Sequence, residues 1–139
     1  MSTASLPVEH LFTMALTADT SAAFQIHKGP AGRRLIAAVG GGTFNGPKLK
    51  GTVAGLTGAD WVTVRADKSF RLDVRLILLT DDGATIYMYY GGIAVNGQAR
   101  SAPYFETGDE RYTWLNNVQG VGIGTIGADG PTYEVYALQ

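Results

Sequence analysis

The chain has 139 residues, no cysteine, and a formal net charge of −1 from 11 basic and 12 acidic side chains. This length predicts one domain, spanning residues 1–139, with a core large enough to fold without disulfides. The missing cysteines exclude disulfides, thiolate metal sites and a cysteine nucleophile. The basic residues are dispersed, which argues against a nucleic-acid-binding face. With no signal peptide and no apolar run long enough for a membrane-spanning helix, we expect a soluble, cytoplasmic protein without membrane partners.

Short apolar runs, rich in β-branched and aromatic residues, alternate along the chain with 19 glycines. This pattern predicts strands joined by tight turns and leaves few windows for a helix. In chain order we expect strands at residues 11–17, 34–39, 50–53, 61–66, 70–80, 85–90, 95–101, 121–126 and 132–138. Residues 19–32 are expected to form a loose connection, and residues 111–116 either a strand or a single helical turn.

Turn signals separate the expected strands, notably Gly46-Pro47, Asp82-Gly83 and the glycine at 130. The pattern fits an antiparallel barrel or sandwich. We expect an all-β fold, a closed or nearly closed antiparallel β-barrel of about eight to ten short strands, because closure removes exposed sheet edges. The triple glycine at residues 40–42 is expected to provide a corner that lets the sheet close.

The segment FRLDVRLILLT, residues 70–80, alternates between two faces. One face is wholly apolar and must be buried. The other carries Asp73 and Arg75, followed by Ile77 and Leu79. Two alternatives remain open for this second face. It is either a solvent-exposed ladder of weak ion pairs, or it lines the lumen, where a buried arginine could anchor a ligand carboxylate or enolate.

Tyrosines, and an acid beside a tryptophan, supply further candidate groups. Tyr87 and Tyr90 lie on opposite faces of the next strand, and a tyrosine that reaches the lumen could donate a proton. Asp60 directly precedes Trp61, and desolvation beside an indole raises the pKa of a carboxyl group, which suits acid–base catalysis. Packing without any chemical role is the alternative for each of these residues.

Several familiar catalytic motifs fail in this sequence. The glycine-rich run GVGIGTIG, residues 120–127, leaves no room for a following βαβ unit, which excludes a dinucleotide-binding fold. His10 and His27 lack metal-ligand spacing, and no serine triad is recognisable. We therefore expect neither a metal nor a cofactor, so that any catalysis would depend on carboxylates, arginine and tyrosine.

Six ordered motifs cover nearly the whole chain: PAGRR (residues 30–34), GGTFNGPKLKG (41–51), GADW (58–61), LDVR (72–75), TDDGATIY (80–87) and FETGDERYTWLN (105–116). Together they resemble the DUF3237, or UPF0311, family of small β-barrel proteins. The resemblance implies a partly polar lumen and a homodimer, and it brings no established general activity. The segment VNGQARSAPY, residues 95–104, is shorter here than in many relatives, which would alter a pocket rim.

Two functions of different classes remain open. The first is a cofactor-free isomerase, cyclase or lyase that moves a proton next to a carbonyl of an oxygenated, aromatic or polyketide-like compound. Its expected catalytic residues are Asp60 or Asp73 as base, Arg75 as oxyanion partner and Tyr90 as proton donor. Its expected substrate-binding residues are Trp61, Arg65, Tyr87, Phe105, Glu106, Trp114 and Asn116.

The second function is a non-catalytic carrier or sensor, which would bind a small ligand with the same residues. A pure interaction module would instead need an exposed apolar patch. The sequence favours the enzyme slightly.

Overall fold

The computed structural model describes residues 3–139, and at residues 19–22 the backbone alone. The strands are β1 (Val8–Gly29), β2 (Gly32–Asn45), β3 (Lys50–Val53), β4 (Ala59–Val64), β5 (Phe70–Thr80), β6 (Thr85–Val95), β7 (Gln98–Ser101), β8 (Tyr104–Glu106), β9 (Gly120–Gly127) and β10 (Gly130–Leu138). One 3₁₀ turn, η1 (Thr113–Asn117), is the single helical turn that was one of the two alternatives for residues 111–116.

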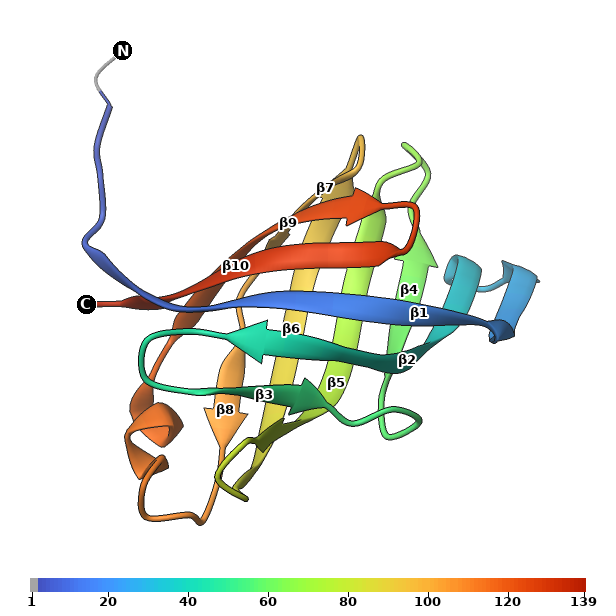
Figure 1. Cartoon of the computed structure of the whole chain (residues 1–139). Coiled ribbons are helices and arrows are strands. Elements are labelled where there is room, and N and C mark those ends of the chain that lie inside the picture. Colours follow the sequence, from blue (N-terminus) through green and yellow to red (C-terminus); the bar gives the residue numbers. More distant parts are fainter. Residues whose placement is uncertain (1–2) are drawn as a thin grey trace.

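Eight of the strands close the barrel. Neighbours pair in the order β5–β4–β2–β1–β10–β9–β7–β6, and pairing between β5 and β6 completes the ring. The two remaining strands extend it, because β3 joins β2 to β5 beyond β4, and β8 pairs with β6 beyond β7. Every pair is antiparallel, with β1 and β10 in front and β5 and β6 behind in Figure 1. The predicted all-β antiparallel barrel is confirmed.

One face of each strand fills the barrel interior. On β5 the residues Val74 and Leu76 are buried, and on β6 the residues Met88 and Tyr90 are buried, as strand alternation requires. Phe12 of β1 packs in the same core. The described part of the chain has no helix long and apolar enough to cross a bilayer.

The triple glycine lies inside β2, where this strand changes its partner from β4 to β3. The pairing register between β1 and β2 also shifts there. A Cβ atom on Gly42 would lie 2.3 Å from the carbonyl oxygen of Ala15, so any side chain at this position would push β1 away. The glycines therefore permit a bend where β2 meets β1, β3 and β4, which fits the expected corner.

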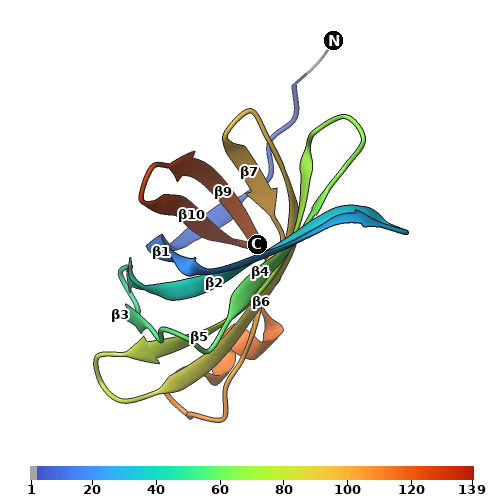
Figure 2. The ribbon, with the colours of Figure 1, turned by 90° about the vertical axis from the view of Figure 1, so that its right-hand side faces the viewer.

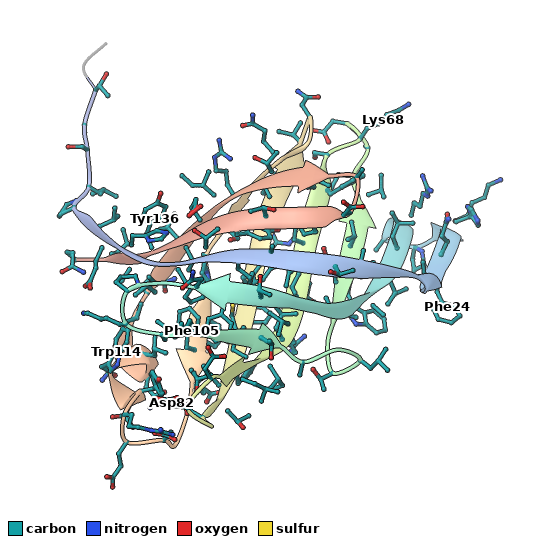
Figure 3. All side chains as sticks on the ribbon, in the orientation of Figure 1. Phe24, Lys68, Asp82, Phe105, Trp114 and Tyr136 are labelled. Atoms are coloured by element: carbon teal, nitrogen blue, oxygen red, sulfur yellow. The ribbon has the colours of Figure 1, made fainter. Side chains whose placement is uncertain are left out.

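The expected loose connection at residues 19–32 is wrong. β1 continues to Gly29 and pairs with β2, so that Phe24 lies opposite Ile36 and Ile26 opposite Arg34. The resulting hairpin extends away from the barrel, with Phe24 at its outer end (Figures 2 and 3). The physical reason is the alternation of apolar and polar residues in FQIH, which supports a strand even where little of it is buried.

The expected strand at residues 95–101 is also wrong, because a two-residue turn divides it. β6 continues through Gly91 and Gly92 to Val95, and Asn96 and Gly97 then turn the chain into β7. Both turn residues have positive φ, at 53° and 75°, as a tight hairpin requires. An Asn-Gly pair between apolar residues is a strong hairpin signal, so the sequence contained the information.

Three of the six sequence motifs meet where η1 closes one end of the barrel. Residues 41–51, 80–87 and 105–116 all contribute to a hollow of about 380 Å³ at this end. Leu115 of η1 is fully buried. The Tyr112 hydroxyl donates to Asp82 Oδ2 at 2.7 Å. Figure 3 shows Asp82, Phe105 and Trp114 gathered at this closed end. These motifs therefore include residues that pack and form hydrogen bonds at the closed end of the barrel.

Candidate functional site

A small cavity of about 80 Å³ lies near the end of the barrel where the β1–β2 hairpin leaves it. Most of its lining is apolar, from residues such as Val39 and Val74. The polar side chains in the lining are Asp60, Tyr90 and Thr17. A carboxyl group and a phenol that share a largely apolar cavity can exchange protons with a bound molecule.

Asp60 reaches the cavity from β4 because it lies on the same face as the buried Val62. Its carboxylate accepts a hydrogen bond from the backbone N–H of Asp73 at 3.2 Å. Burial raises the pKa of Asp60 to about 6, although the hydrogen bond from Asp73 opposes the shift. A carboxyl group with this pKa can both give and accept a proton close to neutral pH.

Tyr90 lies on β6 and is fully buried, with its ring 5.3 Å from that of Tyr133 in an edge-to-face arrangement. Burial raises the pKa of Tyr90 well above its ordinary value, and the neighbouring Tyr133 hydroxyl raises it further. Burial also raises the pKa of Tyr133 to about 12. Both phenols therefore stay protonated near neutral pH, where they can serve as hydrogen-bond donors and not as bases.

Tyr133, which the sequence analysis missed, occupies space left by the glycine-rich run of β9. A Cβ atom on Gly124 would lie 2.5 Å from Cε1 of Tyr133, and one on Gly122 would lie 2.3 Å from the hydroxyl oxygen of Ser101. The run that resembled a nucleotide loop thus makes room for an aromatic ring. The available signal was the alternation in TYEVYAL, which places Tyr133 on one face with Val135 and Ala137.

Asp73 and Arg75 do not face the lumen. The Arg75 side chain is 62% exposed, and its Nη1 lies 3.5 Å from Asp73 Oδ1 on the outside of the barrel. Its guanidinium also lies 5.0 Å from the centre of the Tyr89 ring. Because the alternate residues of β5 fill the core, the lumen alternative is wrong and the exposed ladder is correct. Ile77, which favoured the lumen, is an outward-facing residue as well.

The predicted substrate-binding residues do not gather around the cavity. Trp61 points outward and is 48% exposed, and Tyr87 lies on the outer face, opposite Glu106 of β8. The Nε of Arg65 donates to the hydroxyl of Ser69 at 2.8 Å, in the turn between β4 and β5. Trp61 is therefore not a wall of the cavity that holds Asp60, since alternation directs Asp60 inward and Trp61 outward. It lines a separate open hollow of about 340 Å³ on the outside of the barrel, together with Arg75.

The remaining three residues of that predicted set belong to the closed end. Phe105 is a core residue, 6.1 Å from the ring of Phe12. Trp114 lies under the Lys48 ammonium group at 5.1 Å. The Asn116 side chain accepts from the backbone N–H of Thr107 at 2.8 Å and donates to its carbonyl at 3.0 Å. None of the three lines the cavity that holds Asp60 and Tyr90. Among the side chains that the structure describes, no group of three His, Asp or Glu residues is arranged to hold a metal ion.

A family model and several known proteins match most of this chain. The family model described as "Protein of unknown function (DUF3237)" matches residues 6–138. A UPF0311 protein of Rhodopseudomonas palustris is 29% identical over 155 residues, which cover 98% of this chain and 99% of that protein. The "Hydroalkoxylation enzyme phnH" of Penicillium herquei is 32% identical over 115 residues, which cover 80% of this chain and 69% of that enzyme.

Solved structures have the same fold. A conserved protein of unknown function from Rhodopseudomonas palustris superimposes with a TM-score of 0.88 at 26% identity, and the match covers 99% of this chain and 100% of that one. The structure of an enzyme from Penicillium herquei superimposes with a TM-score of 0.77 at 28% identity, covering 100% of this chain and 99% of that one.

Proposed function

The chain belongs to the DUF3237 family, and we propose that it is an acid–base catalyst. It adds the O–H of an alcohol or phenol across a carbon–carbon double bond of an oxygenated substrate. The observation that carries the proposal is the buried carboxyl group of Asp60, with a pKa of about 6, in one cavity with the Tyr90 hydroxyl. The relative named a hydroalkoxylation enzyme supports this reaction class. When one molecule carries both reacting groups, the addition is a cyclisation and an isomerisation.

The chemistry fits a double bond conjugated to a carbonyl group. The Asp60 carboxylate accepts the proton of the substrate hydroxyl as its oxygen bonds to the β carbon. Negative charge then develops on the carbonyl oxygen, which accepts a hydrogen bond from Tyr90. Asp60 finally returns the proton to the α carbon. One proton moves from oxygen to carbon, one C–O bond forms, and no oxidant or reductant is needed. The reverse sequence is an elimination.

The cavity size limits which part of a substrate enters. A water molecule occupies about 30 Å³ in the liquid, so a cavity of about 80 Å³ admits only a few heavy atoms. An open groove of about 900 Å³ lies about four residues from this cavity along both β2 and β4. It is lined by residues that include Arg33, Arg65, Lys68 and Phe70. This groove could hold the remainder of the substrate, and its three cations favour acidic or oxygen-rich rings. Arg65 would then contact substrate, as predicted from the sequence.

The test is turnover of a panel of phenols and alcohols that carry an enone within reach of the hydroxyl group. Product is followed by mass spectrometry, with Asp60→Asn and Tyr90→Phe as variants. We expect Asp60→Asn to lower turnover by about 10²-fold or more, since general acid–base groups contribute about 10²–10⁴-fold. The exposed Asp129→Asn serves as the control.

An Asp60→Asn variant with full turnover would overturn the proposal. If the wild-type protein binds members of the panel and converts none, the carrier or sensor function is favoured instead.

A further inference from the structure

The open hollow of about 340 Å³ on the outside of the barrel lies where β4 pairs with β5. Two of the sequence motifs, GADW and LDVR, meet there. Its lining comes from these motifs and from the chain that precedes β4, and consists of Leu56, Thr57, Gly58, Ala59, Trp61 and Arg75. The volume falls in the range of about 300–1,000 Å³ that is typical of small-molecule sites. We call this site the outer hollow.

Arg75 brings a loosely paired cation to the outer hollow. Its Nη1 lies 3.5 Å from Asp73 Oδ1, whereas the Nη2 of Arg111, at the closed end, lies 2.8 Å from Asp109 Oδ2. Charge-assisted N–H···O bonds are about 2.7–2.9 Å long, so the pair with Asp73 is weak. The Arg75 side chain is 62% exposed, and its guanidinium lies 5.0 Å from the centre of the Tyr89 ring. Its donors are therefore available to an acceptor from solution.

Trp61 and Leu56 give the outer hollow an apolar surface, since they are 48% and 78% exposed. Leu56 has a φ of 64°, a left-handed conformation that is uncommon for a residue with a side chain and concentrates at binding sites. Its backbone N–H donates to the carbonyl of Val39 at 3.1 Å, and the Thr57 hydroxyl donates to the carbonyl of Ala54 at 3.0 Å. The apolar wall is thus held in place before any ligand binds.

We propose that the outer hollow binds a small aromatic carboxylate. The ring of the ligand stacks on the exposed indole of Trp61, and its carboxylate accepts two parallel hydrogen bonds from the Arg75 guanidinium. The Asp73 oxygen beside Arg75 is buried, so the ligand meets the cation and not this oxygen. One guanidinium matches one carboxylate, whereas nucleic acids and anionic bilayers are bound by several cations together.

This site is independent of the proposed reaction. Asp60 and Trp61 are consecutive residues of β4, so they lie on opposite faces of the strand. Asp60 lines the cavity inside the barrel, and Trp61 lines the outer hollow.

The first experiment is a titration with 2-naphthoate, followed by NMR. The chain has two tryptophans, so their indole N–H signals distinguish the outer hollow, at Trp61, from the closed end, at Trp114. We expect a saturable shift of the Trp61 signal and none of the Trp114 signal. Both 2-naphthamide, which lacks the charge, and acetate, which lacks the ring, should bind at least tenfold more weakly. A Trp61 signal that stays unmoved up to the solubility limit of 2-naphthoate, or equal affinities for the naphthoate and the naphthamide, would overturn the proposal.

The second experiment measures the same binding in variants whose amide spectra show that they are folded. Arg75→Gln should weaken the binding of 2-naphthoate at least tenfold, and Arg75→Lys should recover only part of it, since an ammonium group lacks the planar fork. Arg71→Gln is the matched control, because Arg71 is also exposed on the outward face of β5 and does not line the outer hollow. Equal losses in Arg71→Gln and Arg75→Gln would mean general charge attraction and contradict the assignment. Tyr90→Phe should bind as wild type does. Weakened binding in Tyr90→Phe alone would place the ligand in the cavity with Asp60 and would also contradict it.

Discussion

The carboxylate of Asp60 accepts a hydrogen bond from the backbone N–H of Asp73 at 3.2 Å, where the ladder between β4 and β5 is interrupted. Regular pairing joins Asp60 to Val74 and resumes only at Thr63 and Arg71. The same carboxylate therefore satisfies a backbone donor and supplies the acidic group of the cavity. The hydrogen bond lowers the pKa of Asp60 and burial raises it, and burial is the larger effect.

The balance at Asp60 predicts how stability depends on pH. Its folded-state pKa of about 6 lies above the ordinary value of 3.8. The folded state thus holds the proton of Asp60 more tightly than the unfolded state does. The stability that this proton contributes is fully present below about pH 4 and is lost as pH rises through about 6. Above that range the buried charge costs at most about 3 kcal/mol, since one pKa unit corresponds to about 1.4 kcal/mol. We expect Asp60→Asn, which cannot ionise, to be more stable than wild type at neutral pH.

Urea unfolding of wild type and Asp60→Asn at a series of pH values measures this effect. The difference between the two free energies of unfolding isolates Asp60 from the other acids, including those whose pKa is lowered, such as Asp109 at about 2. The exposed Asp129→Asn is the control and should follow wild type. Parallel curves for wild type and Asp60→Asn would contradict the raised pKa.

The pH dependence of the proposed reaction follows from the same group. Because the first step needs the carboxylate, kcat/KM should rise with pH through a midpoint at about 6 and then level off. Tyr90 should cause no loss of rate up to mildly alkaline pH, since its pKa is raised well above the ordinary value. Steady-state kinetics with a substrate from the enone panel tests this. A rate that falls on raising pH through this range would instead assign the protonated acid to the first step.

The glycines of β9 allow a sharp test of how Tyr133 is held. A Cβ atom on Gly124 would lie 2.5 Å from the Tyr133 ring, whereas one on Gly127 would meet nothing closer than the Gly130 carbonyl oxygen at 3.5 Å. We expect Gly124→Ala to cost about 1–3 kcal/mol, the usual penalty for overpacking a core. It should also shift the pKa of Asp60, whose charge interacts with Tyr133. Gly127→Ala should have neither effect.

Unfolding in denaturant gives the first quantity, and NMR titration of the Asp60 carboxyl carbon gives the second. A Gly124→Ala protein that matches Gly127→Ala in both measurements would show that the ring is not held by this glycine.

Alternation along each strand made the barrel predictable from sequence, because it shows which residues share a face. On β5 it separated Val74 from Arg75 correctly. Alternation does not show which faces of distant strands meet. The outward-facing Ile77 resembled a core residue because it is a large aliphatic residue, which here lies opposite Tyr87 on the outer face of the barrel. Tyr133 belonged to none of the sequence motifs. Asp60 and Tyr90 were predictable as single residues, whereas their meeting in one cavity depends on closure of the ring.

The closed end of the barrel predicts a large and local stability effect. Leu115 of η1 is fully buried, and the motifs around it form hydrogen bonds such as that from Tyr112 to Asp82. Leu115→Ala should lower the free energy of unfolding by about 2–5 kcal/mol, the range for removing a buried leucine side chain. The exposed Leu6→Ala should change it by less than about 0.5 kcal/mol, as surface substitutions do. Because the cavity of Asp60 is at the other end, turnover per folded molecule should stay unchanged in both variants. Loss of turnover in folded Leu115→Ala protein would mean that the closed end contributes to the site, and that the residues of FETGDERYTWLN act in the reaction as well as in the fold.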